Sequence, residues 1–210
     1  GSLPLDKPLF RWTRTRAVIA VVAMLLFYLQ STVVPALAFY FNEVGRSALQ
    51  QDDVLRAEVA FKTASAILPD HAIFKDNLGH VYYRAYGRSR DAESLKRAQQ
   101  QFSEAAAINP NDYQILKHLE ASFIESLARD PRRGPDIHLQ IVELDRKILE
   151  LEPFNPFARK NLAEALFNLG RRKEALEQLS KAIEIEPNYI PAHRRLADWY
   201  QEAGDFGQSE

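Results

Sequence analysis

The fold is decided by the stretch at residues 98–110, AQQQFSEAAAINP, and by its earlier copy at residues 57–69, AEVAFKTASAILP. Both copies share one spacing, Ala-x3-Phe-x2-Ala-x4-Pro. Small residues let neighbouring helices approach closely, the aromatic ring fills the space between them, and proline ends the helix because it cannot continue the hydrogen-bond ladder. Residues 175–187 carry a third copy with Leu179 in the aromatic position.

A degraded fourth copy lies at residues 141–153, where the four positions are Ile141, Asp145, Ile148 and Pro153. The prolines of the four copies, at positions 69, 110, 153 and 187, therefore lie 41, 43 and 34 residues apart. Recurrence at this period predicts a solenoid of helical hairpins, in which each hairpin buries its apolar face against its neighbours.

A second half-pattern precedes each copy: a bulky residue, an aliphatic residue usually followed by Gly or Ala, and then in most copies an aromatic. It is formed by Phe41, Val44, Gly45 and Ala48, by Leu78, Gly79 and Tyr82, by Leu116, Leu119 and Phe123, by Leu162, Ala163 and Leu166, and by Leu196, Ala197 and Tyr200. Together the two half-patterns resemble those of tetratricopeptide repeat (TPR) proteins over about residues 38–210. The resemblance implies an all-α solenoid with repeats at about 38–71, 72–112, 113–155 and 156–189 and a partial repeat at 190–210.

The charge balance and the absence of cysteine exclude several classes of function. The chain has 210 residues, of which 27 are basic and 28 acidic, giving a net charge of −1. Nucleic-acid binding requires a concentrated basic surface, so this balance gives no basis for a nucleic-acid partner. Because the sequence contains no cysteine, disulfides, thiolate metal ligands and cysteine nucleophiles are excluded within it.

A long apolar segment precedes the repeats. Residues 17–41 carry no charged side chain, and Gln30, Ser31 and Thr32 are their strongly polar interruptions. A helix of this length spans about 37 Å at about 1.5 Å per residue, against about 30 Å of hydrocarbon in a bilayer. We therefore expect a transmembrane helix at 17–41 that continues without a turn into the first repeat, with a kink near Pro35.

The flanking charges predict how this helix is oriented. Residues 1–16 carry four basic side chains and one acidic side chain, whereas residues 42–56 carry two basic and three acidic side chains. Positive charge is retained on the cytoplasmic side. The sequence thus predicts a single-pass protein of the bacterial inner membrane, with a cytoplasmic basic segment at 1–16 and a periplasmic TPR solenoid.

A cleaved signal peptide and a buried helix remain alternatives to the anchor. The basic leader, the apolar stretch at 17–29 and the small residues Ala36 and Ala38 at a small-x-small site also fit a signal peptide. Cleavage after Ala38 would leave the first repeat nearly complete. The sequence therefore leaves open whether residues 1–38 are retained.

TPR proteins typically hold an extended peptide or a helix in a groove lined by the first helix of each repeat, and the resemblance implies such a protein partner here. The candidates that face this groove by position mix charge with aromatic and aliphatic groups. They are Ile73, Asp76, Asn77, His80, Tyr83, Arg84, Lys117, His118, Ile124, Lys160, Asn161, Phe167, Arg194 and Arg195. The carboxylate clamp of chaperone-binding relatives is matched by Lys117, Asn161 and Arg195 but not by Ala121 and Pro191.

The two longer repeats suggest a second binding surface. Their extra residues fall between the two helices of each repeat, around 87–91 and 129–135, so both insertions are expected as loops on one rim, which we name the distal rim. Its arginines are Arg88, Arg90, Arg129, Arg132 and Arg133. Arginine suits carboxylate or phosphate, so an acidic partner is one hypothesis, and a solvated loop is the other.

No catalytic or metal-binding motif was identified in the sequence. No two of the five histidines, at 71, 80, 118, 138 and 193, lie three or four residues apart, as metal ligands on one helix would. The sequence has no phosphate-binding glycine loop, no Gly-x-Ser-x-Gly elbow and no His-Glu-x-x-His motif. We therefore expect no enzymatic activity, no cofactor and no metal.

These observations favour a membrane-anchored TPR scaffold that mediates protein–protein interactions at the outer face of the bacterial inner membrane. Two alternatives remain open. The apolar helix leading into long repeats also resembles the C-terminal TPR region of bacterial O-antigen ligase or polymerase-like membrane enzymes, whose catalytic part would lie upstream. The chain could equally be a structural subunit of a larger membrane protein complex.

Overall fold

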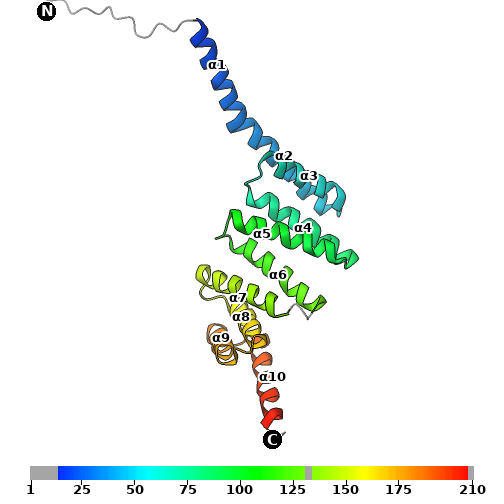
Figure 1. Ribbon diagram of the computed structural model, residues 1–210, viewed down its shortest axis with the longest axis vertical. Coiled ribbons are helices and arrows are strands. Elements are labelled where there is room, and N and C mark those ends of the chain that lie inside the picture. The colour runs from blue at the N-terminus through cyan, green and yellow to red at the C-terminus, as the bar shows by residue number, and fades with distance from the viewer. Residues whose placement is uncertain (1–13, 131–133, 208–210) are drawn as a thin grey trace, which may run out of the picture. The chain divides into compact units, whose positions relative to one another are not determined.

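The computed structural model describes residues 14–130 and 134–207, and every regular element within them is a helix. The chain divides into two compact units, Gly1–Asp70 and His71–Glu210. The first unit contains the apolar helix and one helical hairpin. The second contains the remaining helices (Figure 1).

The apolar segment forms one uninterrupted helix from Arg14 to Gln50, 37 residues long, as expected from the sequence. It consists of α1 (Arg14–Tyr28), the π-helical turn η1 (Leu29–Val33) and α2 (Val34–Gln50). In η1 the backbone N–H of Val34 donates to the carbonyl of Leu29, five residues back. Pro35 follows at once. The irregularity expected near this proline is thus a widened turn within a continuing helix.

The first hairpin pairs α2 with α3 (Val54–Ile67). Gly45 of α2 faces the ring of Phe61, and a Cβ at position 45 would lie 2.7 Å from Cε1 of that ring. Asp53 caps α3 by accepting a hydrogen bond from the backbone N–H of Arg56 at 3.0 Å. The close approach of the two helices therefore depends on the small residue and the aromatic ring that define the repeat pattern.

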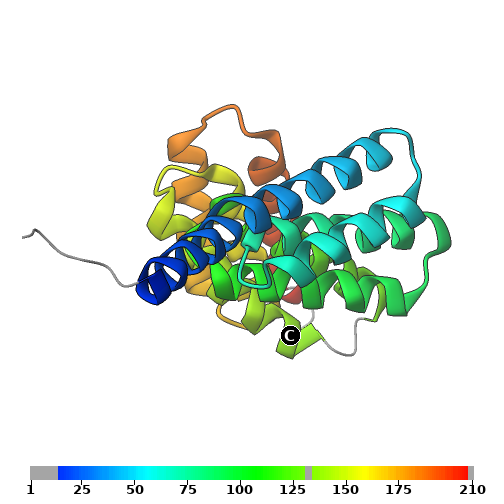
Figure 2. The ribbon, with the colours of Figure 1, turned by 90° about the horizontal axis from the view of Figure 1, so that it is seen from above.

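The second unit is a series of helices in which each helix contacts the next along the chain, as Figures 1 and 2 show. These are α4 (Ala72–Ser89), α5 (Ala92–Ile108), α6 (Tyr113–Arg129), α7 (Gly134–Leu151), α8 (Pro156–Asn168), α9 (Arg172–Ile185) and α10 (Ile190–Gly207). The hairpins α4–α5, α6–α7 and α8–α9 begin at residues 72, 113 and 156. The predicted all-α helical-repeat fold is confirmed.

The helix ends follow from local chemistry. Asp91, Asp112 and Asn155 act as N-caps, each accepting a backbone N–H at 3.0 Å from the first turn of α5, α6 or α8. The signature prolines set the C-terminal ends, because the residue before a proline is disfavoured in a helix. Accordingly α3, α5, α7 and α9 each end two residues before Pro69, Pro110, Pro153 and Pro187.

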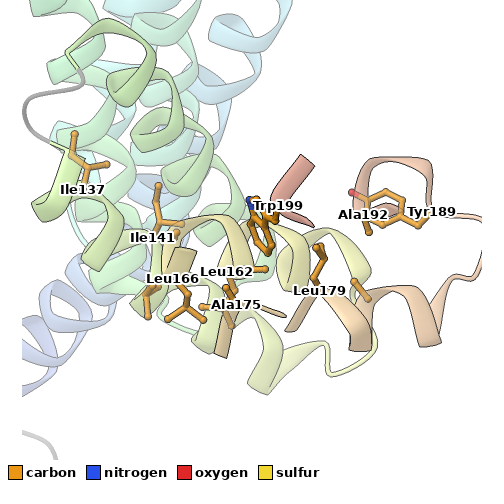
Figure 3. Close-up of a cluster of buried hydrophobic side chains, with 13 residues drawn as sticks. Ile137, Ile141, Leu162, Leu166, Ala175, Leu179, Tyr189, Ala192 and Trp199 are labelled. Atoms are coloured by element: carbon orange, nitrogen blue, oxygen red, sulfur yellow. The ribbon is translucent and has the colours of Figure 1, made fainter. Parts of the chain in front are cut away.

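A large buried cluster joins α7, α8, α9 and α10 (Figure 3). Ile141, Leu166 and Leu179 belong to it, and Trp199 of α10 is 5% exposed within it. Trp199 stacks on Phe167, with ring centroids 4.2 Å apart and planes at 3°. The ring of Phe167 covers one face of Trp199. Burial of this large side chain fixes α10 to the unit.

The insertion of repeat two is mostly helix, contrary to the expected loop, and the insertion of repeat three is described only in part. Residues 87–89 continue α4, which leaves Arg90 and Asp91 as the connection to α5. Arg129 is the last residue of α6. In repeat two the extra residues thus lengthen α4 rather than form an extended loop. Arg132 and Arg133 lie outside the described residues.

Candidate functional site

A cavity of about 470 Å³ lies between the starts of α6 and α8, with one wall from α7. Its walls are mainly apolar and aromatic, and its polar groups are amides and a few charged side chains. The lining residues are Tyr113, Lys117, Glu120, Ala121, Ile124, Ile148, Asn155, Phe157, Ala158 and Asn161. Most protein pockets that bind ligands share this composition of apolar walls with a few placed polar groups.

A second cavity, of about 450 Å³, adjoins the first, since Ile124 and Asn161 line both. It continues toward the ends of α6 and α8 and toward the start of α7. Its other lining residues are Leu127, Ala128, Gly134, His138, Ile141, Glu164, Ala165 and Asn168. The two cavities form one elongated depression along α6 and α8, which we name the α6–α8 groove.

A chain of polar contacts joins the groove residues Glu120, Asn161 and Glu164 to Lys160 and Arg195. Asn161 donates through Nδ2 to Oε1 of Glu120 at 2.6 Å, and Lys160 donates to Oδ1 of Asn161 at 3.1 Å. Glu164 then pairs with Lys160 at 3.2 Å and with Arg195 of α10 at 3.0 Å. The predicted groove residues Lys160, Asn161 and Arg195 are thus brought together, and their polar atoms are oriented by one another.

Two buried carboxyl groups, of the lining residue Glu120 and its neighbour Asp145, lie at one end of this chain of contacts. Asp145 of α7 is fully buried, and Glu120 of α6 is 5% exposed. Burial, together with the neighbouring Glu120, raises the pKa of Asp145 well above its ordinary range. Burial also raises the pKa of Glu120, against the opposing hydrogen bond from Asn161. Two carboxyl groups in one low-dielectric site favour retention of a proton.

A separate cluster of three predicted groove residues joins α4 to α6. Nδ1 of His118 lies 2.9 Å from Oδ1 of Asp76 and 3.2 Å from Nε2 of His80. Nε2 of His80 lies 3.6 Å from Oδ2 of Asp76. Burial, and then the neighbouring His118, lowers the pKa of His80, which favours its neutral form. None of the three residues lines the α6–α8 groove.

The signature aromatic Phe102 supports both imidazole rings of this cluster. Its ring centroid lies 5.3 Å from that of His80 and 5.7 Å from that of His118. Phe102 is itself buried, and Gly79 lies against its ring. The residues that define the repeat thus also position the two histidines.

The other predicted groove residues are dispersed. Ile73, Arg84 and Arg194 are exposed, and Asn77 and Tyr83 are half-buried. Burial raises the pKa of the Tyr83 hydroxyl.

Two further candidates are defined by aromatic contacts. Phe167 lies between the ring of Trp199 and the guanidinium of Arg172, which stands 5.6 Å from its centroid. This position places Phe167 in packing between helices rather than along the groove. Lys117 stands with Nζ 5.8 Å from the ring centroid of Tyr113, at the mouth of the first cavity.

On the distal rim, the structure uses Arg90 and Arg129 for internal contacts. Arg90 pairs with Glu125 at 2.8 Å and lies over the ring of Tyr86, whose hydroxyl also donates to Glu125 at 2.9 Å. Arg129 donates to the backbone carbonyl of Arg90. These contacts connect the ends of α4 and α6. They give Arg90 and Arg129 a structural role within the chain that requires no acidic partner. Arg88 is exposed.

Sequence reasoning missed two features of the site. It did not identify Tyr113 and Phe157, which lie at the first or second position of their helices and therefore precede the positions assigned to the groove. The second missed feature is the cluster of Asp76, His80 and His118, because the spacing criterion considered only pairs of histidines on one helix. The available signal was Asp76 and His80 four residues apart, with His118 on the first helix of the next repeat.

Comparison with known proteins supports the repeat assignment. The sequence model for the tetratricopeptide repeat matches residues 156–189, which include α8 and α9. The TPR repeat-containing thioredoxin TTL4 of Arabidopsis thaliana is 35% identical over 68 residues, and the inactive TPR repeat-containing thioredoxin TTL3 of that plant is 43% identical over 61 residues. These segments cover 32% and 29% of this chain but 10% and 9% of the two relatives.

Solved structures share the fold over most of the chain. YrrB, described as a TPR protein with an unusual peptide-binding site, has a TM-score of 0.58 at 20% identity and covers 86% of each chain. MamA of Desulfovibrio magneticus RS-1, from its residue 41 onward, has a TM-score of 0.65 at 13% identity, covering 81% of this chain and 88% of its own. The chain therefore contains a tetratricopeptide repeat at residues 156–189 and has the TPR helical-repeat fold over most of its length.

Proposed function

We propose that this chain is a binding protein rather than an enzyme, and that it holds an extended or helical segment of a partner protein in the α6–α8 groove. The observation that carries the proposal is the pair of adjoining cavities that share Ile124 and Asn161. Two adjoining cavities along α6 and α8 suit a segment of chain better than a compact small molecule. The peptide-binding site described for YrrB supports a ligand of the same class.

The groove offers both affinity and orientation. Phe157 is 60% exposed at the start of α8, where it meets Tyr189 edge-on with centroids 5.0 Å apart. An exposed aromatic ring held by a neighbour loses little conformational entropy when a partner covers it. The amide of Asn161 and the ammonium of Lys117 supply polar contacts that would fix the direction of the bound segment.

The proposal is tested by selecting random displayed peptides on the full chain in detergent micelles and measuring their affinity for two variants. Phe157→Ala removes an aromatic wall of the groove, and we expect a loss of about tenfold or more in affinity, about 1.4 kcal/mol. Phe154→Ala removes a ring that is 80% exposed and does not line the groove, so its affinity should stay within about twofold of the parent. Equal losses in both variants, or no enriched peptide, would contradict the proposal.

We further propose that the helix Arg14–Gln50 anchors the chain in a membrane. It is the helix in the described residues that is long and apolar enough to cross one, and its most apolar 18-residue window has a mean hydropathy of 2.3 and no buried residue. A signal sequence near an N-terminus meets the same criterion. N-terminal sequencing of protein extracted from its native membrane distinguishes the two, because a start at Phe39 would mean cleavage.

The location proposed for the second unit is the periplasmic face of the bacterial inner membrane. Its support is the charge asymmetry on the two sides of the apolar segment. Protease added to intact spheroplasts should digest residues 71–210 and leave cytoplasmic marker proteins intact. Protection of these residues until the membrane is lysed would contradict this orientation.

A further inference from the structure

We propose that Asp76, His80 and His118 form a binding site for a divalent transition-metal ion, with Zn²⁺ as its best-suited occupant. One ligand atom from each residue lies within 4.8 Å of the other two. Two imidazole nitrogens and a carboxylate oxygen are ligands that Zn²⁺ accepts. The site lies on α4 and α6 and does not depend on the peptide-binding role proposed for the α6–α8 groove.

The distances between the ligand atoms fit a single ion. At a Zn–N distance of about 2.0–2.1 Å, two ligands of a tetrahedral site stand about 3.3 Å apart. The two nitrogen atoms, Nδ1 of His118 and Nε2 of His80, are 3.2 Å apart. Nδ1 of His118 lies 2.9 Å from Oδ1 of Asp76, and Nε2 of His80 lies 3.6 Å from the other carboxylate oxygen, Oδ2. The two nitrogens are therefore already spaced as ligands of one ion, with the Asp76 carboxylate beside both.

Hydrogen bonding within the cluster explains this arrangement less well than an ion does. If Nδ1 of His118 carries a proton and donates it to Asp76, that nitrogen has no second proton for Nε2 of His80 at 3.2 Å. If Nε2 of His80 carries a proton too, two N–H groups face each other across 3.2 Å. The 3.6 Å separation between His80 and Asp76 is too long for a hydrogen bond. One cation would satisfy the three lone pairs together.

The ligand set is held rigidly but remains accessible. Phe102 packs against both imidazole rings, and the rings themselves meet with centroids 4.2 Å apart. The side chains of Asp76, His118 and His80 are 15, 26 and 38% exposed. Three protein ligands with access to solvent leave a fourth coordination position for water or for a donor group of a bound molecule. The nearby cation Arg84 opposes a metal ion, and its exposed side chain is screened by water.

The site would connect two successive repeats, because Asp76 and His80 belong to α4 and His118 to α6. A metal ion there would restrain the two first helices of neighbouring hairpins in one geometry. It would stabilise the folded chain increasingly as the free metal concentration rises above the dissociation constant, since the unfolded chain has no preformed ligand set.

The test is a Zn²⁺ titration of the full chain in detergent micelles by isothermal titration calorimetry, after treatment with a chelator. We expect one ion per chain and an increase in the unfolding temperature on addition of Zn²⁺. His80→Gln and His118→Gln should each weaken binding by at least about 10–100-fold. His193→Gln is the matched control, because its ring contacts the carbonyl of Pro187 away from the cluster, and it should bind Zn²⁺ as the parent does.

A second readout reports the coordination geometry. Co²⁺ absorbs visible light strongly in tetrahedral and weakly in octahedral sites, so the parent chain should develop a strong visible spectrum that His118→Gln lacks. Thermal unfolding of each variant without metal establishes that it is folded. The proposal is overturned if folded His80→Gln and His118→Gln bind Zn²⁺ as the parent does, or if the parent itself binds none.

Discussion

At residue 145 an aspartate occupies the position that Phe61, Phe102 and Leu179 fill in the other three copies of the repeat signature. The sequence identifies this departure from the signature. The protonation of Asp145 also depends on Glu120 of α6, and no spacing rule predicts that Glu120 lies beside residue 145. Burial of both carboxyl groups raises their pKa values. The signature thus predicts the position of residue 145 in the core, and tertiary packing determines its chemistry.

The buried Asp145 predicts an unusual pH dependence of stability. Because its pKa is raised on folding, its favourable contribution is present below the ordinary carboxyl pKa of about 4 and is lost as the pH rises through the raised value. Asp145→Asn should therefore increase the free energy of unfolding at pH 7.5 by about 1–4 kcal/mol, and by less at pH 4.5. Urea denaturation at the two pH values measures this difference.

A matched control for this prediction is Asp136→Asn, the same change at an exposed position of α7. It should alter stability by less than about 0.5 kcal/mol at either pH. A gain for Asp145→Asn that does not grow between pH 4.5 and pH 7.5 would show that the folded protein does not hold the proton.

At the scale of the element, helix α4 contains two glycines with opposite roles. A Cβ at Gly79 would lie 2.5 Å from Cε1 of the buried ring of Phe102, whereas a Cβ at Gly87 would meet nothing within 4 Å. Gly79→Ala should destabilise the chain by about 1–3 kcal/mol through overpacking, and Gly87→Ala should stabilise it by about 0.5–1 kcal/mol. Thermal unfolding of the two variants against the parent checks both signs, and a neutral Gly79→Ala would disprove the close contact.

Helix ends were predictable to different degrees. The signature prolines locate the C-terminal ends of α3, α5, α7 and α9, because proline acts locally. The end of α4 was not predictable. Gly87 and Ser89 indicate a turn, yet the helix continues to Ser89, whose Oγ donates to the carbonyl of Ala85. Contacts of Tyr86 and Arg90 with Glu125 of α6 hold this extension, and tertiary contacts of this kind override local propensity.

For the whole molecule, the exposed apolar face of α1 has the largest consequence. Helix α1 has no buried residue in the structure, and side chains such as Val22 and Leu25 are exposed. Contact of this surface with water is unfavourable in proportion to its area. We expect the full chain to require detergent and to float with liposomes in a density gradient.

The variant Val22→Asp/Leu25→Asp tests this expectation. Each aspartate near the middle of a span costs about 2.5–3.5 kcal/mol of insertion free energy, so the double variant should remain at the bottom of the gradient. Leu55→Asp/Leu139→Asp changes two exposed leucines outside the apolar segment and should float as the parent does. Flotation of all three proteins to the same degree would mean that Val22 and Leu25 do not enter the bilayer.

The period of the signature was sufficient to predict helical hairpins, because each repeat is built from contacts between residues close in sequence. It did not predict the meeting of Asp76 and His80 with His118, or the adjoining cavities along α6 and α8. Those features depend on the side chains that successive hairpins present to each other, and a repeat pattern specifies the small and aromatic positions without the polar ones.

The π-helical turn at Leu29–Val33 separates two parts of one long helix that have different surroundings. Its hydrogen bond reaches back five residues, so the turn holds one residue more than an α-helical turn, and each residue corresponds to a rotation of about 100°. The stripe of Ala38, Gly45 and Ala48 is buried on the side of α2 that packs in the hairpin. The extra residue therefore rotates this stripe about the helix axis relative to the side chains on α1. Removal of a single residue from this turn would rotate the side of the helix that packs on α3 by about 100° about the axis of α1.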